Sequence, residues 1–221
     1  MAEPSFLRDT RASYDSVAAD YAERFQGELT GKPLDRALFA AFAELARAAG
    51  AGPVADIGCG PGHVAAYLHD LGLNAFGIDL SPEMIAVARR SYPGLRFDQG
   101  SMTALDLPDG HLGGVVAMYS IIHIPPDQLP VVFAEFHRVL APGGHVLLAF
   151  QAGDEWRHVT EAFGRPVSVD AYLLPPGHVA GLLGQAGLEV RAQLIREPYE
   201  GLESDQRAYL LARKPLAGHD A

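Results

Sequence analysis

The sequence predicts an α/β fold with a seven-stranded, mostly parallel sheet, helices on both faces and a C-terminal antiparallel hairpin. Three observations predict this fold. Short apolar runs alternate with amphipathic segments in the order β-α-β-α-β and then β-α-β, which is typical of parallel sheets. The first apolar run enters a glycine-rich turn at 58–62. The last two expected strands follow each other without a helix between them, as in a hairpin with a long connection.

The apolar periodicity predicts where each element lies. The segment 13–49 is expected to be helical, with Leu34, Leu38, Phe42 and Leu45 on one face at spacings of three and four. Seven strands are expected at 54–57, 74–79, 95–98, 113–119, 145–150, 188–196 and 206–213. Further helices are expected at 63–71, after the Ser81-Pro82 start signal, at 127–140 and at 176–186. Residues 151–174 are less regular in pattern.

Length and composition indicate a single domain over residues 1–221. Of the 221 residues 48% are apolar, which is enough for one well-buried core. Lysine and arginine number 17 against 27 aspartates and glutamates, and the formal net charge is −10. A surface this acidic repels phosphate backbones and anionic lipid headgroups. We therefore expect neither nucleic acid nor a membrane as a partner.

The cysteine content and the N-terminal residues indicate the compartment. Cys59 is the single cysteine, so no internal disulfide is possible, which suits a reducing environment. The stretch MAEPSFLRDTR lacks the apolar core of a signal peptide, and no apolar run reaches the roughly 18–20 residues that cross a bilayer. The nine histidines show no metal-ligand spacing. We expect a cytoplasmic protein without a metal site, and the oligomeric state stays open.

The glycine-rich turn indicates the kind of cofactor. The first strand runs into Asp56-Ile57-Gly58-Cys59-Gly60-Pro61-Gly62, and in an open α/β sheet ligands bind beyond the carboxyl ends of the strands. A dinucleotide fingerprint requires its third glycine at position 63, where this chain has His63, and no Lys-Ser/Thr follows to make a phosphate-binding loop. Asp79 ends the second expected strand, where a carboxylate accepts hydrogen bonds from ribose hydroxyls. The spacing therefore favours a nucleoside cofactor and argues against a dinucleotide-dependent oxidoreductase.

Several longer segments carry a resemblance to a known family. They are VADIGCGPG (54–62), GIDLSPEMIAVAR (77–89), LPDG (107–110), HRVLAPGG (137–144), YDSVAADYAERF (14–25) and REPYEGLESDQRAYLLARKP (196–215). Together they resemble class I S-adenosylmethionine-dependent methyltransferases, in particular the ubiquinone/menaquinone-biosynthesis-like group that acts on small molecules. The resemblance implies a Rossmann-like fold, S-adenosyl-L-methionine as cofactor and a small-molecule acceptor. It divides the domain into an N-terminal helical cap (1–49), a cofactor-binding half (50–150) and a substrate-side half with the closing hairpin (151–221).

The same resemblance implies which residues hold the methyl donor. Asp79 would bind the ribose, Asp56 would orient the loop and meet the amino group, and Tyr21 would close over the donor's carboxylate. Many relatives carry an aspartate where Ser101 stands, so a hydroxyl or a backbone carbonyl would meet the adenine amino group here. The full implied set is Tyr21, Asp56, Gly58, Cys59, Gly60, Gly62, Asp79, Leu80, Met84, Gly100, Ser101, Met102, Met118, Tyr119 and Ser120.

The acceptor side is indicated by fewer residues. His123 follows the fourth expected strand directly, and because an imidazole titrates near neutrality it is the candidate general base, or alternatively a polar wall residue. We expect the acceptor pocket to be formed by Tyr14, His123 and the segment 151–174, with Trp156 and Tyr172 as walls.

Two other functions stay open on sequence grounds. The first is a non-catalytic protein that binds S-adenosylmethionine, and the second is a methyltransferase acting on RNA or protein. Within the small-molecule class, oxygen, nitrogen and carbon acceptors all fit the same scaffold, because a fold does not determine a function.

Overall fold

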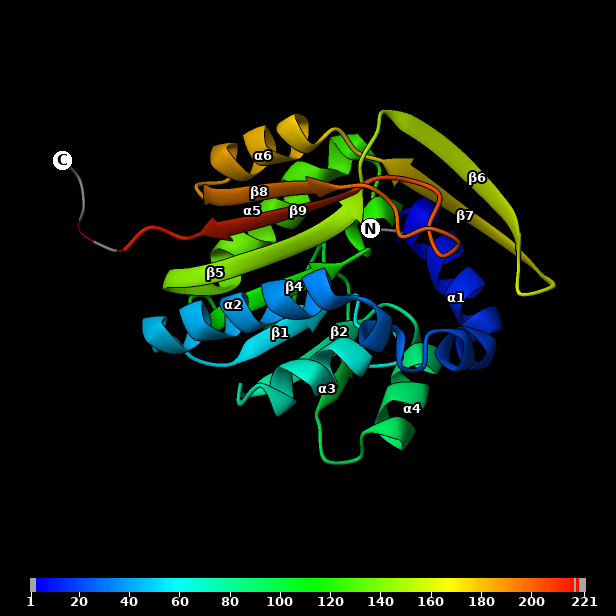
Figure 1. Cartoon of the computed structure of the whole chain (residues 1–221), viewed down its shortest axis with the longest axis horizontal. Coiled ribbons are helices and arrows are strands. Elements are labelled where there is room, and N and C mark those ends of the chain that lie inside the picture. The colour runs from blue at the N-terminus through cyan, green and yellow to red at the C-terminus, as the bar shows by residue number, and fades with distance from the viewer. Residues whose placement is uncertain (1–2, 217, 219–221) are drawn as a thin grey trace.

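The computed structural model describes residues 3–216 and 218. Seven strands form one sheet in the order β3-β2-β1-β4-β5-β9-β8, and a separate hairpin pairs β6 with β7 (Figure 1). The strands are β1 (Val54–Ile57), β2 (Ala75–Asp79), β3 (Phe97–Gln99), β4 (Leu112–Met118), β5 (Leu140–Gln151), β6 (Glu155–Ala162), β7 (Arg165–Leu173), β8 (Glu189–Arg196) and β9 (Arg207–Arg213). In the large sheet β9 alone runs antiparallel to both of its neighbours, β5 and β8. The predicted fold class is confirmed.

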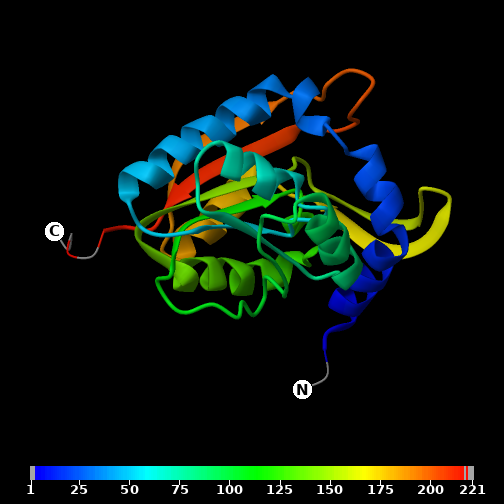
Figure 2. The same ribbon diagram turned by 90° about the horizontal axis from the view of Figure 1, so that it is seen from below.

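Helices cover both faces of the large sheet. The helices are α1 (Ser5–Arg24), α2 (Pro33–Ala49), α3 (His63–Asp70), α4 (Pro82–Ser91), α5 (Leu129–Val139) and α6 (Pro176–Gln185), with short 3-10 turns η1 (Glu28–Gly31), η2 (Ile121–His123) and η3 (Pro126–Gln128). The helices α2 and α3 bury apolar residues of one face, and α5 and α6 bury those of the other. Figure 2 shows α2 and α5 on opposite sides of the sheet. None of the helices in the described residues combines the length and apolarity of a membrane span.

The predicted N-terminal helix over 13–49 is wrong in its continuity. The chain forms α1, then η1, then α2, because Gly27 takes a left-handed φ of 71° and Pro33 starts a new helix at its first position. The helix α1 begins earlier than expected, at Ser5, and lies across the strand ends beside β7 and α4 (Figure 1).

The predicted buried face of α2 is also wrong at three of its four positions. The buried residues of this helix are Asp35, Phe39, Phe42, Ala43 and Ala46. Leu34, Leu38 and Leu45 each precede a buried position by one residue, so they lie at the margin of the buried face, where Leu34 and Leu38 are half-buried and Leu38 still packs against the core. Leu45 is consequently 37% exposed. The residues that pack on the sheet are two phenylalanines and two alanines, whereas the leucine spacing marks the flank of the helix.

The segment 151–174, expected to be irregular, contains the hairpin β6–β7. Most of β6 is exposed on both faces, so it has no alternation of apolar and polar residues to signal a strand. Cross-strand pairs such as Trp156 with Tyr172 run along the hairpin, and β7 buries Val169 and Leu173. Figure 1 shows the hairpin beside α1, beyond the edge of the main sheet.

Candidate active site

The glycine turn after β1 is held against β2 by its own backbone. The amides of Gly58 and Cys59 both donate to the carbonyl of Ile78, at 2.7 Å and 3.1 Å. A Cβ on Gly58 would lie 2.2 Å from the Cβ of Ser120, and one on Gly62 would lie 2.7 Å from the ring of Phe97. These two glycines therefore permit internal packing. A Cβ on Gly60 would meet only Tyr21, at 3.9 Å, so Gly60 is the position where the backbone is open to a ligand.

Asp79 ends β2 with its carboxylate facing the turn. Its Oδ2 accepts a hydrogen bond from the Gly60 amide at 2.7 Å, and its Oδ1 accepts one from the Ser81 amide at 2.9 Å. Burial raises the pKa of Asp79 to about 6, although these two amide bonds act in the opposite direction. Because a carboxylate has about four acceptor positions, the oxygens can accept two further hydrogen bonds from a ligand.

Asp56 has no polar partner for one of its oxygens. The residue is 1% exposed, and its Oδ2 makes no hydrogen bond. Burial raises the pKa of Asp56 to about 8, with a smaller contribution from the nearby charge of Asp79, so its carboxyl group is mostly protonated at neutral pH. Asp56 lines a cavity, where a cationic group of a ligand would favour its ionised form.

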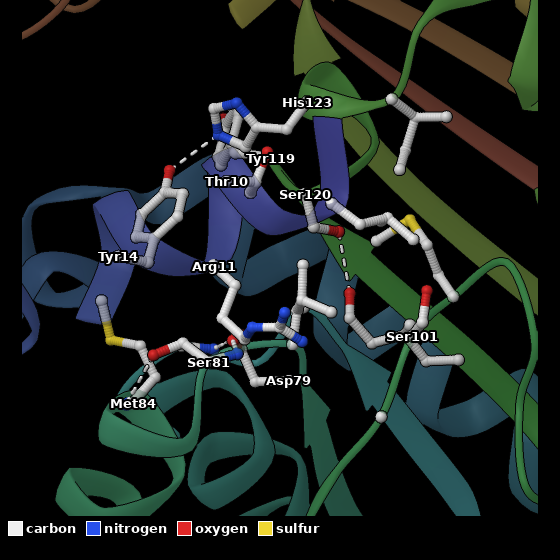
Figure 3. A pocket seen from close by; sticks show the side chains of 18 of the residues that line it. Thr10, Arg11, Tyr14, Asp79, Ser81, Met84, Ser101, Tyr119, Ser120 and His123 are labelled. Carbon is white, nitrogen blue, oxygen red and sulfur yellow. Dashed lines mark hydrogen bonds between the residues drawn. The ribbon is translucent and has the colours of Figure 1, made fainter. Parts of the chain in front are cut away.

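Two cavities share part of their walls at this edge of the sheet. The smaller, of about 90 Å³, lies between α1 and the ends of β1, β2 and β4 (Figure 3). The larger, of about 590 Å³, extends towards η1 and the start of β9. Residues common to both are Tyr14, Tyr21, Gly58, Gly60, Met118, Tyr119 and His123. A ligand in the smaller cavity would therefore have one end at the opening of the larger.

Tyr14 and His123 form a hydrogen-bonded pair where the two cavities meet. The hydroxyl of Tyr14 and the Nε2 of His123 are 2.7 Å apart, as drawn in Figure 3. The Nδ1 of His123 is 2.7 Å from the carbonyl oxygen of Asp170. A carbonyl only accepts, so Nδ1 carries the proton and Nε2 accepts from Tyr14. Burial lowers the pKa of His123, which keeps the imidazole neutral at pH 7.

The side chain of Asp170 contacts a second histidine. One of its carboxylate oxygens is 2.7 Å from the Nδ1 of His158, on the neighbouring strand β6. The hairpin β6–β7 thereby positions the backbone carbonyl that orients His123. The role of Asp170 was not apparent in the sequence, because it depends on a strand pairing that the local pattern does not reveal.

The helix α1 is attached over the smaller cavity by side chains that the sequence reading missed. The hydroxyl of Ser81 donates to Asp15 at 2.5 Å, and the same hydroxyl accepts from the amide of Met84 at 3.1 Å, as expected of a helix N-cap. Arg11, also on α1, lines the smaller cavity. Ser81 as N-cap was predicted, but its bond to Asp15 was not, because Asp15 lies 66 residues away in the chain.

Most residues of the implied donor set lie together. The smaller cavity is lined by Tyr21, Gly58, Gly60, Asp79, Leu80, Met84, Gly100, Ser101, Met102, Met118, Tyr119 and Ser120. Asp56 and Cys59 line the larger cavity. Gly62 lines neither cavity. It is the residue before α3, with a left-handed φ of 88°, and it packs against the ring of Phe97.

The two aromatic walls expected for the acceptor lie elsewhere. Trp156 is 59% exposed on β6 and lines neither cavity. Tyr172 lines a third cavity of about 40 Å³ next to His123. The larger cavity instead carries charged side chains that the sequence reading did not identify, among them Lys32, Glu203 and Arg207. The isolated Lys32, in a chain with only two lysines, was the available signal.

The parallel sheet edge, the glycine turn and the carboxylate at the end of β2 define a nucleoside-binding α/β protein. Comparison with known families gives the class more narrowly, because residues 54–144 match the methyltransferase domain family. These residues are a methyltransferase domain, and the chain has the fold of class I S-adenosylmethionine-dependent methyltransferases.

Curated relatives are similar to part of the chain. A malonyl-[acyl-carrier protein] O-methyltransferase from Pectobacterium atrosepticum is 34% identical over 113 residues, covering 51% of this chain and 44% of the relative. A demethylmenaquinone methyltransferase from Chlorobaculum parvum is 36% identical over 92 residues, covering 41% and 37%. The matched stretch thus spans less than half the length of each of these relatives.

Solved structures extend the similarity of the fold to nearly the whole chain. The complex of DhpI with SAH has a TM-score of 0.71 at 21% identity, covering 97% of this chain and 99% of that one. Magnesium protoporphyrin IX methyltransferase from Synechocystis, with bound SAM, has a TM-score of 0.70 at 16% identity, also covering 97% and 99%.

Proposed function

We propose that this protein is an enzyme that transfers a methyl group from S-adenosyl-L-methionine to a small molecule. The observation that carries the proposal is the Asp79 carboxylate, bonded to the Gly60 amide and facing a cavity within a methyltransferase domain. Both of its oxygens retain acceptor capacity for the two hydroxyls of a ribose. The names of the relatives, which include trans-aconitate 2-methyltransferase, agree with small-molecule acceptors of several kinds.

The residues present fit the donor at each end of the smaller cavity. Gly60 leaves the backbone open beside Asp79, and Met84, Leu80 and Met102 supply apolar contact for an adenine. The smaller cavity opens into the larger one, whose wall includes Asp56. The oxygen of Asp56 that has no hydrogen-bond partner suits the amino group of the methionine part. When bound, S-adenosylmethionine supplies an electrophilic methyl group on a sulfonium. The protein's main contribution is alignment, which lowers the barrier by roughly 7–11 kcal/mol in favourable cases.

The pair of Tyr14 and His123 supplies a base where the acceptor must lose a proton. Burial raises the pKa of Tyr14 above its ordinary value, so the phenol remains protonated and acts as a relay. The acceptor's proton passes to the Tyr14 oxygen, and the phenolic proton passes to Nε2 of His123. The carbonyl of Asp170 stabilises the resulting imidazolium through Nδ1. The sequence-based expectation of His123 as base is thereby refined, with Tyr14 in contact with the acceptor.

The proposal also includes the partners and the compartment. A net charge of −10 supports a small-molecule acceptor over a nucleic acid and a cytoplasmic setting away from anionic lipid surfaces. The acceptor atom, oxygen, nitrogen or carbon, is left open.

Turnover with labelled donor tests the proposal. The protein is incubated with S-adenosylmethionine labelled in its methyl group and with a pool of small-molecule metabolites. We expect labelled product and an equal amount of S-adenosylhomocysteine, both absent with Asp79→Ala. Binding of the donor without any turnover would instead support the non-catalytic alternative.

A further inference from the structure

A cluster of cationic side chains lies at one end of the larger cavity. The ammonium of Lys32 and the guanidinium of Arg207 each lie 5.5 Å from the centre of the Tyr119 ring. Lys32 precedes α2 and is 7% exposed, and Arg207 begins β9 and is 8% exposed. In a chain with a net charge of −10, two enclosed cations beside one ring are a distinct local feature.

Three carboxylates, those of Glu203, Glu28 and Asp35, lie among the cations in this part of the molecule. Glu203 accepts two hydrogen bonds from Arg196, at 2.5 Å and 3.0 Å, and one from the Tyr199 amide at 3.0 Å. Its remaining contacts are longer, 3.3 Å to Lys32 and 3.6 Å to Arg207. Burial acts to raise the pKa of Glu203, but the hydrogen bonds from Arg196 and the Tyr199 amide, with the charges of Arg207 and Lys32, lower it to about 2. Among these cations, Arg207 has the weakest pairing, because its contact with the Glu203 carboxylate is the 3.6 Å one.

Lys32 and Arg207 differ in what else they contact. Lys32 also pairs with Glu28 at 2.5 Å, whereas Arg207 donates from Nη1 only to the carbonyl of Asp205, at 2.7 Å. The Nε of Arg207 is buried and lies 3.6 Å from the Oε1 of Glu203, which is beyond hydrogen-bond distance, and the Oε1 of Gln151, in the same cavity wall, also lacks a hydrogen-bond partner. A ligand in the cavity could complete the hydrogen bonding of this buried donor and this buried acceptor.

The strand order places this cluster on the acceptor side of the site. The donor residues lie at the ends of β2, β1 and β4, which are adjacent in the sheet. Gln151 ends β5 and Arg207 begins β9, the next two strands beyond β4, where they face each other in register. Tyr119, which follows β4, therefore separates the donor from Arg207.

We propose that the methyl acceptor carries a carboxylate, which Arg207 binds with the assistance of Lys32. This inference rests on the proposed methyltransferase function and narrows its substrate to acidic small molecules. The planar guanidinium group of Arg207 can donate two parallel hydrogen bonds to a carboxylate. Both cations lie 5.5 Å from the centre of the Tyr119 ring, which positions them next to each other. The ion pair with Arg207 holds the substrate by its carboxylate. The atom that receives the methyl group then faces Tyr14 and the methyl donor.

Calorimetry on protein saturated with S-adenosylhomocysteine tests the proposal. The probes are benzoate and malonate, with benzamide and malonamide as uncharged counterparts. We expect at least one carboxylate to bind and its amide not to bind. Arg207→Gln should weaken the carboxylate by at least about tenfold, the size of a charge-assisted hydrogen bond, and Arg207→Lys should restore part of the loss. Lys32→Gln gives an independent variant if Arg207→Gln does not fold.

The matched control is Arg213→Gln, at the opposite end of the same strand and paired with Glu189. It should leave carboxylate binding unchanged, and all four variants should bind S-adenosylhomocysteine within about twofold of the original protein. The proposal is overturned if no carboxylate binds, if the amides bind equally, or if Arg207→Gln and Lys32→Gln weaken S-adenosylhomocysteine instead. That last result would assign the cations to the donor's own carboxylate. Failure of the original protein to bind S-adenosylhomocysteine at all would refute the methyltransferase function itself.

Discussion

The proposed donor side and the proposed acceptor side of the site are built in different ways. On the donor side, the turn after β1 and the end of β2 are joined by backbone hydrogen bonds, such as those from Gly58 and Cys59 to Ile78. On the acceptor side, the walls come from segments remote in sequence, including η1, the hairpin β6–β7 and the loop before β9. Side-chain pairs hold these segments together, with Glu203 in contact with Lys32, which lies 171 positions earlier.

This difference separates binding of the methyl donor from specificity for the methyl acceptor. A donor site built from the backbone would depend on few side chains, and the fold that supplies this backbone is kept at 16–21% identity. An acceptor site built from side chains on long connections can change its charge and shape without disturbing the sheet. We therefore expect substitutions on the two sides to affect different measured quantities.

The largest expected effect concerns the proton relay between the two sides. His123→Ala and Tyr14→Phe should each lower kcat by roughly 10²–10⁴-fold, because each removes one atom of the relay. The dissociation constant of S-adenosylhomocysteine should change little, since neither side chain bonds to Asp79 or to the glycine turn. Steady-state kinetics measures the effect on kcat, and calorimetry measures the effect on the dissociation constant. Unchanged turnover in both variants would leave these residues as cavity walls.

A second comparison lies within the glycine turn. Gly58→Ala places a Cβ 2.2 Å from Ser120 at a φ of 76°, so we expect a loss of about 2–5 kcal/mol in the free energy of unfolding. Gly60→Ala meets no atom closer than 3.9 Å at a φ of 52°, so the loss should be only about 1 kcal/mol. Urea unfolding of both variants measures the difference. Equal losses would show that the turn is not packed as described.

The pH dependence of donor binding tests the role of Asp56. Its pKa of about 8 means that the carboxyl group is protonated below pH 8 in the free protein. A cationic amino group binds the ionised form better, so affinity for S-adenosylhomocysteine should rise from pH 6.5 to about pH 8 and then level off. Calorimetry in buffers of different ionisation enthalpy should detect proton release on binding. Asp56→Asn should remove this pH dependence, and a retained dependence would assign it to another group.

The smallest expected effect is at Trp156. Its side chain is 59% exposed and lines neither of the two larger cavities, so Trp156→Ala should change the free energy of unfolding by about 0.5 kcal/mol or less. A role in acceptor binding, as the sequence suggested, would appear as a raised KM for the acceptor. Arg207→Gln is the informative companion, because it lies in the wall of the larger cavity.

The sequence was sufficient to predict the sheet and to place most residues of the proposed donor side around one cavity, for a physical reason. Strands buried on both faces are mainly apolar, and β4, as well as β1 apart from Asp56, is of this kind. The donor set follows directly after such strands, so Gly58, Asp79 and Tyr119 could be placed at one edge from the order of elements alone.

The rest could not be predicted, because it depends on long-range contacts. The strand β6 is mostly exposed and so lacks a hydrophobic period, although its partner β7 buries Val169 and Leu173. The buried face of α2 was misassigned because alanines and phenylalanines pack on the sheet, whereas leucines were taken as the marker. Arg207 resembles a surface arginine until β9 is paired with β5 and its first residue is seen to face the cavity.

The central claim is that the carboxylate of Asp79 and the turn at Gly60 bind the nucleoside of S-adenosylmethionine. Calorimetric titration of the protein with S-adenosylhomocysteine tests it most directly, with Asp79→Asn measured in parallel. We expect one site per chain with a micromolar dissociation constant, weakened by at least about tenfold in the variant, since each lost hydrogen bond to a charged group is worth roughly 1.5–3 kcal/mol. No measurable heat with the original protein, or equal affinity in the variant, would contradict the account.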